Sequence, residues 1–149
     1  MITQSGDWSI GSEAADIAAY LVDVQGDDPV QEHRWSYCRC GGEIFLLDFS
    51  EDHQCAKFNC TSCGGIHLIA DSEECWEDAR EDASIARFDC GNCEEESVNI
   101  GVSYSLYQDA EVGVKWLCVG TRCVAGGALD YATFMKIANQ PSMHMLDRA

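Results

Sequence analysis

Basic residues are scarce in this chain, which has nine lysines and arginines against 26 aspartates and glutamates in 149 residues. The formal net charge at pH 7 is -17. Nucleic-acid phosphates and anionic lipid surfaces are bound through lysine and arginine, and a strongly negative protein repels both. The composition therefore argues against direct binding to nucleic acid or to a membrane, and it favours a basic protein as the partner.

Long apolar runs and proline are also lacking. The chain has two prolines, and no apolar stretch is long enough to span a membrane. Residues 1–11 have neither the basic start nor the apolar stretch of a secretory signal peptide. With 46% hydrophobic and 23% charged residues, the composition is that of a folded protein. We expect one compact domain over residues 1–149, located in the cytoplasm.

Complete catalytic motifs are absent from the sequence. It contains no HExxH motif, no glycine-rich phosphate loop and no GxSxG motif. The four histidines are scattered along the chain: His33, His53, His67 and His144. Trp35 and Trp116 lie in segments with strand character, and we expect both to fill the core.

Cysteine, by contrast, is abundant, with ten residues that cluster in close pairs. Disulfides do not persist in a reducing compartment, so this clustering indicates metal binding. The complete set is Cys38, Cys40, Cys60 and Cys63, in which each pair is followed by two glycines. Glycines let backbone amides approach the thiolate sulfur, and four thiolates complete a tetrahedral site. The sequence therefore predicts a metal site at these four residues.

The motif CRCGG that begins at Cys38 and the motif CTSCGG that begins at Cys60 resemble the paired knuckles of the zinc-ribbon family. The resemblance covers residues 37–69 and departs from the family at the first pair, where one residue separates the cysteines instead of the usual two. It implies a zinc ion with a structural role, because four thiolates leave no coordination position open for water. Paired cysteine knuckles also hold iron, so the metal stays open between zinc and iron.

A second set, Cys90, Cys93 and Cys123, repeats this pattern incompletely. Cys90 and Cys93 form a knuckle, but the residue in the place of Cys63 is Gly126. The match between the two halves favours a duplicated ribbon whose second copy is degenerate. One zinc ion is expected at the first set, and a second ion would require the second set to bind metal.

Three interpretations of the second set stay open. It is a relic without metal, it borrows a fourth ligand from Cys118, His144 or an acidic side chain, or it holds zinc with an open coordination position and is catalytic. Cys118 is a poor fourth ligand, since a regular strand would place it about 16 Å from Cys123. We expect Cys118 and its counterpart Cys55 to be interior strand residues, and Cys75 to be part of the core.

Apolar spacing predicts a helix over residues 13–22, with Ile17 and Leu21 on its buried side, and an acidic helix from residue 71 or 72 to residue 82. Strands are expected over 30–37, 43–49, 54–59, 66–70, 85–89, 98–107 and 114–120, with a turn over 108–113. For residues 128–138 the pattern does not decide between helix and strand.

The expected fold class is α+β, mostly antiparallel β, with two zinc-ribbon-like hairpin modules, an N-terminal helix and a central acidic helix. The sub-modules are a zinc ribbon over 30–70, the acidic helix over 71–84 and a degenerate second ribbon over 85–149.

The acidic helix concentrates much of the negative charge, and its carboxylates are candidates for partner binding. These are Glu73, Glu74, Glu77, Asp78, Glu81 and Asp82. Complementary charge speeds association with a basic partner. Our first hypothesis is an acidic zinc-binding interaction protein that inhibits or neutralises a basic protein partner, as an immunity protein or antitoxin covers a nuclease toxin. The alternatives are a zinc-ribbon adaptor of transcription or another macromolecular complex, and a zinc-dependent enzyme that uses an open second site.

Overall fold

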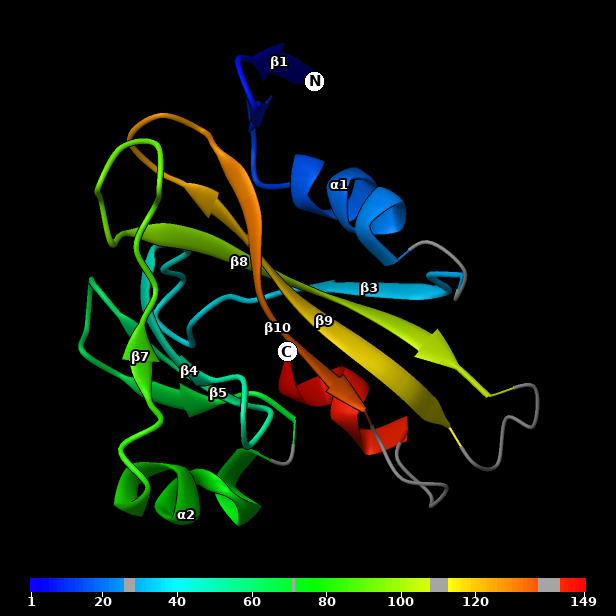
Figure 1. Cartoon of the computed structure of the whole chain (residues 1–149), viewed down its shortest axis with the longest axis vertical. Coiled ribbons are helices and arrows are strands. Elements are labelled where there is room, and N and C mark those ends of the chain that lie inside the picture. The colour runs from blue at the N-terminus through cyan, green and yellow to red at the C-terminus, as the bar shows by residue number, and fades with distance from the viewer. Residues whose placement is uncertain (26–28, 71, 108–112, 137–142) are drawn as a thin grey trace.

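The computed structural model describes residues 1–25, 29–70, 72–107, 113–136 and 143–149, and of Met143, His144 and Arg148 it describes the backbone alone. Antiparallel strands make up most of the described fold, and the helices are few and short (Figure 1). The helices are α1 (Asp16–Gln25), η1 (Ser72–Glu74), α2 (Trp76–Glu81) and η2 (Met143–Arg148). The strands are β1 (Ile2–Ser5), β2 (Trp8–Gly11), β3 (Glu32–Trp35), β4 (Phe45–Ser50), β5 (Cys55–Cys60), β6 (Ile66–Leu68), β7 (Ala86–Arg87), β8 (Val98–Leu106), β9 (Val114–Cys123) and β10 (Leu129–Lys136).

Every strand expected from the sequence is present, with ends that differ from the expected ones. β9 continues to Cys123 instead of ending at residue 120, because its backbone stays paired with β8 up to Val98. The undecided segment is the strand β10 as far as Lys136, and its remaining residues lie outside the described part of the chain. Of the turn expected over 108–113, only Gly113 is described. The β1–β2 hairpin was not expected, because its strands are short and largely polar.

Helix α1 starts later than its apolar pattern indicates. The expected start at residue 13 is wrong, because residues before Asp16 form a turn held by the Asp16 carboxylate. That carboxylate accepts hydrogen bonds from the amides of Ser12 at 2.8 Å and Glu13 at 3.2 Å. The expected apolar side is correct, since Ile17 and Leu21 are both fully buried.

The expected acidic helix is two short pieces, η1 and α2, separated at Cys75. The side chain of Ser72 ties the first piece to the sheet, because its hydroxyl accepts a hydrogen bond from the Ala56 amide at 2.9 Å and donates to the Ile69 carbonyl. The other expected starting residue, Asp71, lies outside the described residues. The acidic segment is therefore anchored to β5 at its beginning.

Two three-stranded meanders with the same register build the main sheet. The first is β4–β5–β6 and the second is β8–β9–β10. In the first, Phe45 pairs with Cys60, and in the second, Val98 pairs with Cys123. The cysteine that ends the middle strand therefore holds the same place in both meanders.

The third strands correspond in the same way. Ile66 of β6 lies opposite Asn59, and Leu129 of β10 lies opposite Arg122. Each of these pairs comes one position before the final cysteine of the middle strand. Residues of the two meanders can therefore be matched one to one at the strand ends beside the cysteines, while the knuckles that begin at Cys38 and Cys90 differ in length by one residue.

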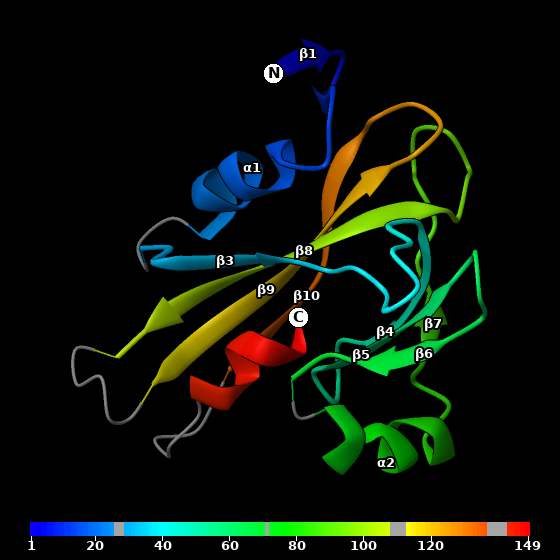
Figure 2. The ribbon, with the colours of Figure 1, turned by 180° about the vertical axis from the view of Figure 1, so that it is seen from behind.

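The two meanders meet where Phe45 and Val98 pair with each other in antiparallel fashion. Because these two residues hold equivalent places, this is the pairing that a two-fold axis between them would produce. The strands that precede the first knuckle of each half are exchanged across this axis: β3 pairs with β8, and β7 pairs with β4. Figure 2 shows β3 lying along β8, with β6 at the edge beside β5.

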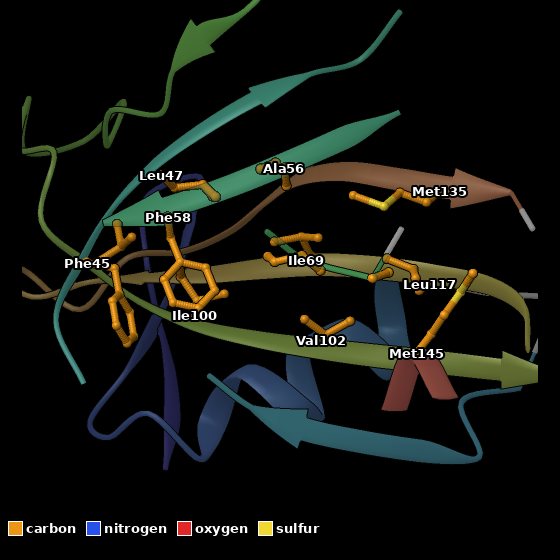
Figure 3. Close-up of a cluster of buried hydrophobic side chains, with 14 of the residues drawn as sticks. Phe45, Leu47, Ala56, Phe58, Ile69, Ile100, Val102, Leu117, Met135 and Met145 are labelled. Carbon is orange, nitrogen blue, oxygen red and sulfur yellow. The ribbon is translucent and has the colours of Figure 1, made fainter. Parts of the chain in front are cut away.

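The main core lies between the two halves of the sheet. Figure 3 shows side chains of β4 and β5 facing those of β8, β9 and β10, closed at one end by Met145 of η2. Cys118 points to the opposite face of β9, where it packs with Ile17 and Leu21 of α1. The sheet thus buries both faces of β9, which explains the nearly continuous burial of this strand.

Candidate metal centres

Three of the cysteine turns share one backbone hydrogen-bond pattern. The amide of the first cysteine donates to a carbonyl beyond the turn, and an amide at the end of the turn donates back to the carbonyl of that cysteine. These turns begin at Cys60, Cys90 and Cys123, with hydrogen bonds of 2.7–2.9 Å. The residue that donates back has a positive φ in each case: +74° at Gly64, +59° at Glu94 and +77° at Gly127. The turn at Cys123 therefore keeps the knuckle conformation although it lacks a second cysteine.

The turn at Cys38 is a shortened version of the same pattern. Its amide donates to the Gly42 carbonyl at 2.8 Å, and the Gly41 amide donates back at 2.8 Å. Gly41 has a φ of +88°, a conformation that favours glycine. The one-residue spacer between Cys38 and Cys40 is thus accommodated by a tighter turn.

The four thiols of the first set lie together, as the sequence predicts. The Sγ atoms of Cys38 and Cys63 are 3.4 Å apart, and those of Cys40 and Cys60 are 3.6 Å apart. All four sulfurs lie within 4.8 Å of one another. A tetrahedral ion with metal–sulfur bonds of about 2.3 Å separates its sulfurs by about 3.8 Å. The residues therefore fit a four-thiolate metal site, and the set could hold a metal ion.

Backbone amides prepare Cys60 of this set for the thiolate form. The backbone amide of Cys63 donates toward the Cys60 sulfur and lowers the pKa of Cys60 to about 6, while burial acts in the opposite direction. Gly42 is required beside it, since a Cβ there would lie 2.7 Å from the Cys60 sulfur. The Gly65 amide donates to the Cys63 sulfur at 3.3 Å. The Gly65 amide thus has the role that the sequence assigned to the paired glycines, and Gly42 leaves the space that the Cys60 sulfur occupies.

The second set is also brought together, with three thiols. The sulfurs of Cys90, Cys93 and Cys123 lie within 4.8 Å of one another, and the Cys93 amide donates to the Cys90 sulfur at 3.4 Å. Burial acts to raise the pKa of Cys123, but hydrogen bonds from the Gly126 amide, from the thiols of Cys90 and Cys93 and from the Ala125 amide together lower it. This group could hold a metal ion through three thiolates.

Gly126 stands where a fourth cysteine of the second set would be expected, and the space for a side chain there is already occupied. A Cβ at Gly126 would collide with the Cys93 sulfur, which therefore fills the space next to the missing side chain. Among the described residues, no other histidine, cysteine or carboxylate places a ligand atom within 4.8 Å of all three sulfurs. The side chain of His144, one of the candidate fourth ligands, lies outside the described part of the structure.

Cys55 and Cys118 hold equivalent interior positions, as expected. Cys55 pairs with Ser50 and Cys118 with Ser103, and both cysteines are fully buried. Burial raises the pKa of each to about 12, so both stay protonated. Cys118 packs on the α1 face of the sheet and does not join the second set. Cys75 is half-buried near Cys55.

The N-terminal hairpin covers the second set, a role that its sequence did not indicate. Trp8 and Ile10 pack against Cys90, Cys123 and Ala128. An isolated antiparallel bridge between Ile10 and Ala128 links the hairpin to the residue that precedes β10. The second set is therefore enclosed by protein on this side.

The six carboxylates proposed for partner binding are all exposed. They lie on η1, on α2 and at the C-terminal end of α2, around the buried Ala79. Glu77 forms an ion pair with Arg80 at 2.6 Å, and the Asp82 carboxylate is hydrogen-bonded to Nε2 of His53 at 2.9 Å. The segment thus presents an acidic surface, which follows the first set of cysteines in the sequence. We call it the acidic face, and it consists of Glu73, Glu74, Glu77, Asp78, Glu81 and Asp82.

A groove next to the first set, lined by aromatic and charged side chains, was missed from the sequence. Trp35 is not in the core as expected, because it is 56% exposed, and Tyr37 is 70% exposed. The groove has a volume of about 670 Å³, and its charged lining residues are Arg34, Arg39, Glu73 and Asp147. The sequence hints at this groove only by placing aromatic residues and arginines close together over residues 34–39. The other wall includes the edge strand β6, which is far from these residues along the chain.

No protein-family model, curated protein or solved structure matches this chain. Among the described residues, no helix is both long enough and apolar enough to cross a membrane. All ten cysteines are described, and each is a free thiol. The two groups of thiols and the surfaces around them are therefore the features of this chain that indicate a function.

Proposed function

We propose that this chain is an acidic zinc-binding interaction protein that covers a basic surface of a partner protein, in the manner of an immunity protein or antitoxin. The observation that carries the proposal is the acidic face, in which six carboxylates are exposed on one anchored segment. Fixed charges of one sign on a rigid segment steer a partner of opposite charge and select it by complementarity.

The first cysteine set supports a structural zinc ion within this proposal. Zinc is favoured because four thiolates in a tetrahedron leave no open position and match its ligand preference. When bound, zinc would hold the turns at Cys38 and Cys60 together and so fix the meander that carries the acidic face. We infer further that both meanders are ribbon modules derived by duplication, and that the protein works in a reducing compartment such as the cytoplasm.

The geometry of the second set gives little support to the alternative of a zinc-dependent enzyme. Trp8 and Ile10 pack against its two buried cysteines, Cys90 and Cys123, and the described residues supply no fourth ligand atom beside the three thiols. An adaptor role is compatible with the same surfaces, but the acidic face favours a basic protein as the target.

Reversal of charge on the acidic face tests the proposal. The triple variant Glu77→Lys, Asp78→Lys and Glu81→Lys changes three exposed carboxylates without touching the core. The matched control reverses Glu94, Glu95 and Glu96, which are also exposed and give the same change in net charge. In capture from the native host, the wild type and the control should retain a basic partner that elutes with salt, and the acidic-face variant should lose it. Equal retention by both variants would refute the proposal.

A further inference from the structure

The β1–β2 hairpin, which covers the second set of cysteines, shows how a cysteine knuckle can accept an additional strand beside it. The Trp8 ring lies over Gly91, where a Cβ would be 3.1 Å from the nearest ring carbon. Gly11 donates its amide to the Gly127 carbonyl at 2.8 Å, and Ile10 pairs with Ala128. The N-terminal hairpin therefore docks by backbone pairing beside the knuckle and by one aromatic ring above it.

The first cysteine set has the same backbone without such a cover. Gly64 corresponds to Gly127, yet among the described residues its carbonyl has no hydrogen-bond partner. Ile66 is 60% exposed, whereas its counterpart Leu129 is 1% exposed. β6 is the last strand of the sheet order, so its outer edge is unpaired within the described chain. An open strand edge of this kind is a template for β-pairing.

A hollow of about 620 Å³ lies where the hairpin sits in the other half. The residues that line it are Cys38, Arg39, Cys40, Cys63, Gly65, Ile66 and His67. Arg39 stands at the position that matches Gly91 under the Trp8 ring. Its side chain is exposed and forms no ion pair with any described residue, in contrast to Arg34, Arg80 and Arg87.

We propose that this hollow binds an extended segment of a partner protein, which pairs through its backbone with residues Gly64–Ile66. An aromatic side chain of that segment packs against Arg39. A neighbouring carboxylate of the segment pairs with the Arg39 guanidinium. Backbone pairing supplies the affinity, and the side chains supply the choice of segment. A guanidinium stacks on aromatic rings and pairs with carboxylates, so Arg39 suits both neighbours. The surrounding Trp35 and Tyr37 add exposed aromatic surface of the kind found at binding hot spots.

The proposal does not depend on the acidic face. The hollow adjoins the acidic face, because Glu73 lines the groove that also contains Arg39, but the hollow itself contains no carboxylate. Arg39 attracts a carboxylate, whereas the acidic face attracts basic groups. The chain itself contains a segment with the required chemistry, because Asp7 precedes Trp8 and Ile10 in the strand that covers the second set.

A synthetic peptide with the sequence of residues 5–11, Ser-Gly-Asp-Trp-Ser-Ile-Gly, serves as the probe. Titrated into the full chain, it should bind, and the amide of Ile66 should become protected from hydrogen exchange. Replacing Trp8 by alanine within the peptide should weaken binding about tenfold or more, as for an aromatic anchor. Absence of binding at millimolar peptide, or equal binding of the alanine peptide, would overturn the proposal.

A charge exchange makes the test specific to Arg39. Arg39→Glu in the protein should weaken binding of the parent peptide, and a peptide with Asp7 replaced by lysine should bind this variant better than it binds the wild type. Arg80→Ala, on an exposed arginine of α2, is the matched control and should bind as the wild type does. If Arg39→Glu leaves binding unchanged, the proposal fails.

Self-association is the competing outcome. If the chain forms dimers that Trp8→Ala abolishes and the peptide dissociates, the occupant is a second copy and the proposal of a partner segment is overturned. The triple acidic-face variant, which includes Glu77→Lys, should bind the peptide as the wild type does. Loss of the basic partner by this variant therefore tests the proposed function, and loss of peptide binding by Arg39→Glu tests the hollow.

Discussion

Replacement of Cys63 by serine separates metal binding from packing at the first set of thiols. Cys63 and Cys60 both contribute sulfurs, but Cys60 is 2% exposed whereas Cys63 is exposed. A change at Cys60 would disturb the buried knuckle even without metal. Cys63→Ser alters one exposed atom, so in metal-free protein the free energy of unfolding should change by less than about 0.5 kcal/mol.

The expected effect with zinc is much larger. Structural zinc bound by four ligands contributes about 10–16 kcal/mol in small zinc domains, which is about 2.5–4 kcal/mol for each ligand. Loss of the Cys63 sulfur, which lies 3.4 Å from that of Cys38, should therefore lower zinc affinity by about 10²–10³-fold. The stabilisation that zinc adds to the folded state should fall correspondingly.

Two measurements check this prediction. Competition with a chromophoric chelator gives the zinc affinity, and urea unfolding with and without zinc gives the stabilisation. Ser62→Ala, an exposed change within the same turn, is the control and should behave as the wild type. If Cys63→Ser keeps full zinc affinity, or if it destabilises the metal-free protein as strongly as the zinc-bound one, the four-thiolate assignment is wrong.

Two further predictions concern the fold. Gly120→Ala should destabilise the protein by about 1–3 kcal/mol, because the new Cβ would lie 2.8 Å from both Ile17 and Leu21, and the loss should appear as a lower midpoint in urea or thermal unfolding. Combination with Ile17→Ala should cost less than the sum of the two changes, and strict additivity would contradict the proposed clash. His33 has its pKa lowered to about 4 by burial and by the charge of Arg34, so the unfolded chain binds more protons between about pH 4 and 6.5 and stability falls as the pH drops through this range. His33→Gln in metal-free protein should lose less stability across the same range, and parallel stability curves for the two proteins would rule out this role.

Local spacing explains which features could be anticipated. The grouping of the thiols of Cys38, Cys40, Cys60 and Cys63 was expected because close cysteine pairs followed by glycines already define their own turns. The buried side of α1 followed from the spacing of Ile17 and Leu21. These features depend on residues a few positions apart, and their geometry is set by short-range backbone conformation.

Features that depend on remote partners were not anticipated. Trp35 has a strand-like sequence context, but its burial depends on what lies over β3, and β3 pairs with β8 from the other half of the chain. The exposure of Trp35 and the groove around Arg39 follow from this exchange. The anchoring of η1 to β5 likewise depends on the hydrogen bond from the Ala56 amide to the Ser72 hydroxyl, which joins residues 16 positions apart.

The first set of thiols, the acidic composition and the mostly antiparallel character of the fold were thus contained in the sequence. The second set was visible as three cysteines, but only the tertiary structure determined that Trp8 and Ile10 cover it and that the equivalent surface at Gly64 is open. The reason is physical, since a knuckle forms from its own residues whereas a strand edge is covered or left open by segments far away in the chain. The difference between the two halves therefore arises from long-range pairing.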